Sequence, residues 1–235
     1  MIRAAIMLAF WGLLLLIVGP VLLLVTVVSR SVTPLYRGAS RLSWLGMRLV
    51  GVRTEVRGID HLEPGRTYIF MPNHSSNLDP PVLVRAIPGR TSILVKKELF
   101  RIPILGTGMR LAELVPVDRT DREAAIESVN AAISVMQRGL HMLVFPEGTR
   151  TSDGRLLPFK KGPFHLAMES GVPVVPITIL GTFESWPKTR FALRPGTVTV
   201  FFHEPIDPRT FTDRELLIKA VRDEIESALP PERRD

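Results

Sequence analysis

The feature that most constrains this chain is an uninterrupted apolar stretch near its start. Residues 4–29 contain no charged side chain. As a helix they would extend about 39 Å, more than the roughly 30 Å hydrocarbon core of a bilayer. A secretory signal peptide has a shorter apolar core and ends in a small-residue cleavage site, and no clear A-x-A site follows here. The sequence therefore predicts a membrane anchor, with a cleaved signal peptide as the alternative.

A Gly19-Pro20 pair falls near the middle of this stretch. Proline removes a helical hydrogen-bond donor and clashes with the preceding turn, so we expect a kink there. A full span of the bilayer and a shallow hairpin that enters and leaves on one side are both open. Arginines follow the stretch in either case, and the positive-inside tendency then predicts that the protein lies on the cytoplasmic face of the cell membrane.

Positive charge is concentrated beside the anchor. Residues 1–50 hold five arginines and no acid, so they supply +5 of the net charge of +7 and leave +2 for residues 51–235. Thr33-Pro34 indicates the start of a helix, on which most of these arginines share one narrow band. This pattern favours an interfacial helix on an anionic membrane and gives no basis for nucleic-acid binding. The alternative is a helix packed on the globular part with a solvated basic face.

The rest of the chain predicts one α/β domain over residues 51–235, after an anchor and interfacial helix over residues 1–50. Short β-branched runs alternate with amphipathic stretches, which is typical of a mostly buried mixed sheet of about seven strands flanked by helices. The expected strands are 52–57, 67–71, 92–95, 113–117, 141–145, 174–180 and 197–202. Two clear helices are expected at 121–138 and up to residue 229, opened by capping boxes at Thr120 and Thr212.

His74 is the first candidate for chemistry. Of the five histidines, it alone has an acid five positions later, Asp79. Both follow an expected strand, where active groups of open α/β sheets collect. A turn leading into a helix can fold the Asp79 carboxylate onto one imidazole nitrogen and leave the other free to take a proton from a hydroxyl. The alternative is a structural histidine that caps a turn.

Two further blocks follow expected strands. Residues 145–150 read Phe-Pro-Glu-Gly-Thr-Arg, in which glycine lets the backbone approach a ligand and Arg150 can hold an anion. Residues 115–119 end in Arg119, again at a strand end. A tight surface turn and an exposed strand-end charge are the respective alternatives. Three strand ends that each deliver a general base or an anion contact are together harder to explain as surface features.

In order, these blocks resemble the membrane-bound glycerolipid acyltransferases of the lysophosphatidic acid acyltransferase family. The matching segments are 73–79, 115–119, 145–150 and 172–177, with lesser matches at 96–99, 159–162 and 205–206. The match covers residues 65 to 207. One departure is Val115-Pro116-Val117, where the family more often has a Phe-Ile pair, which could alter acceptor fit without removing Arg119.

The resemblance implies transfer of a fatty acyl group from acyl-CoA or acyl carrier protein to the free hydroxyl of lysophosphatidic acid, giving phosphatidic acid. It implies His74 as general base, held by Asp79. The acceptor is expected to be held by Arg119, Glu147, Gly148, Thr149, Arg150 and Lys96. Because like charge prevents Glu147 from holding phosphate, we expect it to orient Arg150 or another base, or to contact an acceptor hydroxyl.

The composition agrees with direct transfer. The chain has no cysteine and no G-x-S-x-G elbow, so it lacks the usual covalent nucleophiles, and we expect neither a metal nor a cofactor beyond the acyl-thioester co-substrate. Another lysolipid acceptor, or a phospholipid donor in a transacylation, would use the same chemistry. A non-catalytic membrane lipid-binding protein is the alternative from a different class.

Overall fold

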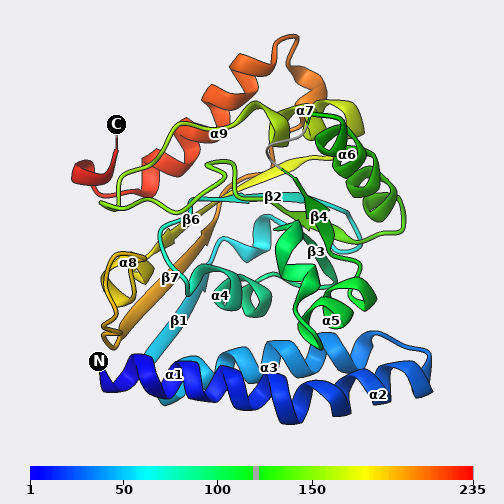
Figure 1. Ribbon diagram of the computed structural model, residues 1–235. Helices are drawn as coiled ribbons and strands as arrows, with labels where there is room; N and C mark the ends of the chain where they lie inside the picture. The colour runs from blue at the N-terminus through cyan, green and yellow to red at the C-terminus, as the bar shows by residue number, and fades with distance from the viewer. Residues whose placement is uncertain (119–121, 235) are drawn as a thin grey trace.

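A single twisted sheet organises the protein. The computed structural model describes residues 1–118 and 122–234, and in this part of the chain seven strands form one sheet in the order β1-β7-β6-β2-β5-β3-β4 (Figure 1). The strands are β1 (Val52–Arg57), β2 (Ile69–Pro72), β3 (Thr91–Lys96), β4 (Val115–Val117), β5 (His141–Leu143), β6 (Val174–Leu180) and β7 (Gly196–Phe202). All neighbours are parallel except β6 and β7. The mixed α/β sheet expected from the sequence is confirmed.

The two faces of the sheet bury separate cores, as the alternation of side chains along a strand requires. Tyr68 and Phe70 face a core shared with α3 and α4, whereas Ile69 and Met71 face a core shared with α6, α7 and α9. Figure 1 shows these helices in two layers. The helices are α1 (Ile2–Leu13), α2 (Gly19–Ser29), α3 (Thr33–Leu49), α4 (Asp79–Ala86), α5 (Leu105–Leu111), α6 (Arg122–Gln137), α7 (Lys161–Ser170), α8 (Thr182–Ser185) and α9 (Arg214–Ala228).

The two helices expected from periodicity are present as α6 and α9. The α9 cap differs from the expectation: Asp213, not Thr212, occupies the N-cap, and its carboxylate accepts a hydrogen bond from the Glu215 amide. Asp213 stands one residue closer to the helix, so its side chain reaches the second amide of the first turn. Thr120, the cap expected for α6, lies outside the described residues.

The N-terminal stretch forms one continuous helix of 28 residues, the only described helix long and apolar enough to cross a membrane. A π-helical turn, Leu14–Val18, joins α1 to α2, and the Gly19 amide donates to the carbonyl of Leu14 five residues back. Proline has no backbone N–H, so the helix lacks one of its regular hydrogen bonds at Pro20. The wider π-helical turn just before Pro20 accommodates the proline ring. The helix therefore continues through the Gly19-Pro20 pair, and its one irregularity, the π-helical turn, lies just before the position where a kink was expected.

This long helix and α3 lie side by side along the body of the protein (Figure 1). Ala4 and Met7 are fully buried in the α3–α4 core, and Phe10 lies directly against Gly46 of α3. The opposite face exposes large aliphatic side chains: Ile2, Ile6, Leu13, Leu16, Ile17, Leu24, Val27 and Val28. The helix does not turn back at Gly19-Pro20, as a hairpin within residues 4–29 would, and it packs against α3 along its length. The expected boundary at residue 50 falls in the turn between α3 and β1.

Helix α3 combines the two alternatives considered for it. Its Ser43, Gly46 and Met47 are buried against the body, whereas its arginines are exposed. The Arg48 guanidinium lies 5.4 Å from the centre of the Trp44 ring, which is itself 45% exposed. A tryptophan beside an arginine at the surface is typical of a membrane interface.

Candidate active site

The strand order brings the sequence blocks to one edge of the sheet. Strands β2, β5, β3 and β4 are neighbours and run parallel, so their carboxyl ends meet along one edge. His74 follows β2, Glu147 follows β5, and Lys96 ends β3. Arg119, expected after β4, lies outside the described residues. Segments far apart in sequence thus share one site because of topology.

Asn73 fixes the point at which the chain leaves β2. Its side-chain amide donates to the carbonyl of Ile179 at 3.1 Å, and its side-chain oxygen accepts from the Ile179 amide at 2.6 Å. The Asn73 amide also donates to the carbonyl of Ile177. These bonds carry the β2–β6 pairing one residue beyond the strand, so the backbone that bears His74 is rigidly placed. This role of Asn73 was not predicted from the sequence, because it depends on the tertiary pairing of β2 with β6.

The expected contact between His74 and Asp79 is present. His74 Nδ1 lies 2.8 Å from Asp79 Oδ2, and the Asp79 side chain is fully buried. The same oxygen accepts from the Ser75 and Ser76 amides, each at 2.8 Å. Asp79 is the first residue of α4, so its carboxylate folds back over the preceding turn. With Nδ1 held by a carboxylate, Nε2 is the nitrogen available to take a proton.

Phe145 covers one face of the His74 ring. The two rings are stacked with centroids 3.8 Å apart and planes inclined by 23°. Together with Asp79 this contact fixes both the position and the plane of the imidazole. From the sequence, Phe145 was only the first residue of the block 145–150, and its contact with the His74 ring was not predicted.

Glu147 holds the backbone of the site. Its Oε1 accepts from the His74 amide at 2.5 Å, its Oε2 accepts from the Leu157 amide at 2.9 Å, and the residue is 2% exposed. Burial raises the pKa of the Glu147 carboxyl to about 7, although both amide hydrogen bonds act in the opposite direction. The expected partner Arg150 instead donates to the side-chain oxygen of Asn77. The geometry thus makes Glu147 a positioning group.

The remaining block residues form the outer part of the site. The Gly148 amide closes a turn by donating to the Phe145 carbonyl, with a positive φ of 71° that glycine adopts without strain. Thr149 is exposed, and Arg150 bridges this loop to the loop after His74. The Lys96 ammonium is exposed and lies 3.6 Å from Glu98, and none of the contacts between described residues joins it to His74 or Glu147.

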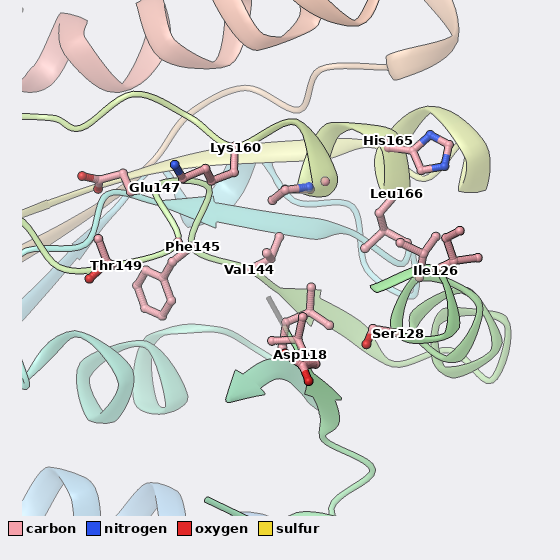
Figure 2. A pocket seen from close by; sticks show the side chains of 16 residues that line it. Asp118, Ile126, Ser128, Val144, Phe145, Glu147, Thr149, Lys160, His165 and Leu166 are labelled. Atoms are coloured by element: carbon pink, nitrogen blue, oxygen red, sulfur yellow. The ribbon is translucent and has the colours of Figure 1, made fainter. Parts of the chain in front are cut away.

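A cavity of about 620 Å³ opens beside the site, between the ends of β3, β4 and β5 and helices α6 and α7; Figure 2 shows the side chains that line it. Phe145 and Glu147 belong both to its wall and to the surroundings of His74. Six of its sixteen lining residues are aliphatic: Leu94, Val117, Ile126, Val129, Val144 and Leu166. The volume is within the range of about 300–1,000 Å³ usual for ligand pockets.

Comparisons with known proteins place this geometry in context. A family model described as Acyltransferase matches residues 53–180. A 1-acyl-sn-glycerol-3-phosphate acyltransferase of Limnanthes alba is 39% identical over 70% of this chain and 58% of its own length. The 1-acyl-sn-glycerol-3-phosphate acyltransferase alpha of Homo sapiens is 33% identical over 74% of this chain and 62% of its own length. The chain thus spans about three fifths of these curated relatives.

A solved structure is similar over nearly the whole chain. The crystal structure of the 1-acyl-sn-glycerophosphate (LPA) acyltransferase PlsC from Thermotoga maritima superposes with a TM-score of 0.85 at 26% sequence identity. The match covers 96% of this chain and 92% of that one. The similarity therefore includes the N-terminal helices as well as the sheet.

Proposed function

The chain belongs to the acyltransferase family, as its sequence blocks implied, and from this premise we propose that it acylates lysophosphatidic acid to phosphatidic acid in phospholipid biosynthesis. The acyl donor is a thioester, either acyl-CoA or the acylated form of acyl carrier protein. The observation that carries the proposal is the 2.8 Å contact between His74 Nδ1 and the buried Asp79 carboxylate, beside a ligand-sized apolar cavity.

The reaction follows from that contact. His74 Nε2 takes the proton of the acceptor hydroxyl as its oxygen attacks the thioester carbonyl. The tetrahedral intermediate then collapses, the carbon–sulfur bond breaks, and the departing thiolate receives the proton from the imidazolium. The Asp79 carboxylate stabilises the imidazolium formed between the two steps.

Neighbouring hydroxyl groups support direct transfer over an acyl-enzyme route. The Ser75 hydroxyl lies 3.1 Å from that of Thr182, and the Ser76 hydroxyl donates to the carbonyl of Trp186 at 2.6 Å. Both serines are buried, and Asp79 occupies Nδ1 of the nearby imidazole. A serine whose hydroxyl is committed to another group is not activated as a nucleophile.

The two substrates would take different parts of the site. Arg150, the exposed Thr149 and Lys96 would hold the acceptor phosphate, together with Arg119, and the turn at Gly148 shapes this loop. A guanidinium is suited to this because it can donate two parallel hydrogen bonds to a phosphate. The aliphatic cavity next to Phe145 would take an acyl chain. The apolar α1–α2 helix would hold the protein at the cytoplasmic face of the membrane, where the lipid acceptor and the lipid product reside.

The test is turnover of purified full-length protein with acyl-CoA and lysophosphatidic acid. We expect His74→Ala to lower kcat by roughly 10²–10⁴, because a general base contributes that much. His61→Ala is the matched control, since His61 contacts the Phe202 carbonyl away from this edge and should leave kcat unchanged. Near-normal kcat in folded His74→Ala would refute the assignment of the base.

The same assay distinguishes the alternatives. A matrix of lysolipid acceptors against acyl-CoA, acyl carrier protein and phospholipid donors, read by mass detection of products, identifies another acceptor or a transacylase. If none of the tested pairs of donor and acceptor yields product, the result would support a non-catalytic lipid-binding protein.

A further inference from the structure

The segment between β3 and α5 exposes apolar side chains that the proposed reaction does not use. This β3–α5 segment comprises residues 97–104. Leu99 is 38% exposed and Ile102 is 39% exposed, three positions apart on the turn that follows β3. Single exposed leucines are common on soluble proteins. Three further properties distinguish this pair: a rigid backbone, continuity with the apolar helix, and flanking positive charge.

The segment is held rigidly in place. The carbonyl of Phe100 lies so close to Gly106 that a Cβ there would be 2.1 Å from its oxygen. The Gly106 amide donates to the Ile102 carbonyl at 2.8 Å, and Arg110 donates to the Phe100 carbonyl at 3.1 Å. Ile104 has a φ of 65°, a conformation that strains a β-branched residue. Leu99 and Ile102 are therefore presented at the surface by a fixed backbone.

The segment adjoins the apolar N-terminal helix. Ile104 packs so closely on α2 that a Cβ at Gly19 would lie 2.7 Å from its side chain, and Gly108 of α5 faces Leu23 of α2. Figure 1 shows α5 next to α2 and α3. The segment that bears the exposed pair is thus in direct contact with the long apolar helix.

The charge around the pair is positive. Lys96, Lys97, Arg101 and Arg110, against Glu98 and the Asp118 carboxylate that pairs with Lys97, give the surroundings of the pair a net charge of +2 (four minus two). Arg101 and Arg110 are exposed. Aliphatic side chains surrounded by cations match the boundary between acyl chains and anionic headgroups, where each cation is worth about 1 kcal/mol. A protein partner would have to cover this pair and the aliphatic face of α1–α2 together.

We propose that the β3–α5 segment is a second membrane-docking element, which inserts Leu99 and Ile102 into an anionic bilayer beside the α1–α2 helix. Its partner is the lipid surface. Because β3 ends at Lys96 on the edge that holds His74, this docking brings the bilayer to the mouth of the site. The inference rests on the proposed membrane location and does not require acyl transfer.

The absence of cysteine from the chain allows a direct test. The full-length Leu99→Cys variant is labelled with an environment-sensitive fluorophore and reconstituted into phosphatidylcholine vesicles with and without phosphatidylglycerol. Leu216→Cys is the matched control, because Leu216 is 53% exposed on α9, on the other side of the sheet from α1–α3 (Figure 1). We expect a blue shift and protection from iodide quenching at position 99 alone, stronger with phosphatidylglycerol. Equal quenching at the two positions would overturn the proposal.

A second measurement addresses function. We expect Leu99→Ser with Ile102→Ser to raise the apparent KM for acceptor in vesicles roughly five- to tenfold, with kcat for detergent-dispersed acceptor unchanged. Equal loss in both formats would indicate a structural role and contradict the proposal. If the protein instead lacked acyltransferase activity, the fluorescence result would be unaffected, so the two proposals fail separately.

Discussion

Glu147→Gln tests the conclusion that this residue is a buried positioning group. The pKa of the Glu147 carboxyl rises from 4.5 to about 7 on folding, because burial disfavours its charged form. For an acid with a raised folded pKa, the native state binds more protons than the unfolded state, so stability falls as pH rises. The loss begins above pH 4.5 and is nearly complete above pH 7. A difference of this size corresponds to about 3 kcal/mol.

Glutamine removes this titration, so the free energy of unfolding of wild-type protein should decline from pH 4 to pH 8 by about 3 kcal/mol relative to Glu147→Gln. Denaturant titrations in detergent, followed by tryptophan fluorescence at several pH values, measure the difference. Glu232→Gln is the control, because Glu232 is exposed and its loss should leave the shape of the curve unchanged. Parallel curves for wild type and Glu147→Gln would refute the reasoning.

The same substitution should reduce activity through the backbone of His74. A glutamine side chain has one oxygen, so either the His74 or the Leu157 amide meets an NH₂ group and loses its acceptor. A buried donor without a partner costs about 1–3 kcal/mol. We expect kcat to fall with little change in KM. A rise confined to acceptor KM would instead favour direct contact between Glu147 and substrate.

Two further predictions concern neighbouring positions. Asp79→Asn should lower kcat by about 10²–10⁴ with the fold intact, because the neutral amide no longer stabilises the imidazolium. Circular dichroism checks the fold, and kcat is measured at several pH values. An unchanged kcat would contradict the prediction. Gly106→Ala should destabilise the protein by about 1–3 kcal/mol, since its Cβ would collide with the Phe100 carbonyl. Thermal unfolding measures this, with Gly162→Ala as the control, because a Cβ there has open space and neither glycine has a positive φ. An equal shift for the two variants would contradict the collision.

The fold was largely predictable because its strands are short apolar runs between polar turns. The ranges expected for β1 and β6 match the structure, and the other five are displaced by a few residues at their ends. These displacements occur where pairing, not composition, decides the end. The expected strand at 141–145, for example, stops at Leu143, because Phe145 turns to cover His74.

The site was predictable only where its geometry is local. Asp79 is five residues from His74, and one turn leading into a helix brings them together. Glu147 is 73 residues from His74 and ten from Leu157, so its partners depend on the order of β2 and β5 in the sheet. From its charge, Glu147 was expected to orient Arg150 or another base, or to contact an acceptor hydroxyl. Burial changed that outcome, because the interior offered two amide donors at fixed positions.

The base and the membrane helices share one packed core. Asp79 begins α4, and Val82 and Leu83 of α4 lie in the same buried cluster as Met47 of α3 and Met7 of α1. Interiors pack at the density of organic crystals, so a displacement on one side of such a cluster moves the other. The carboxylate that fixes His74 is therefore mechanically connected to the N-terminal helices, which we propose to contact lipid. Because the β3–α5 segment also lies against α2, both sides of the proposed site take their position from the same N-terminal helices, α1 to α3.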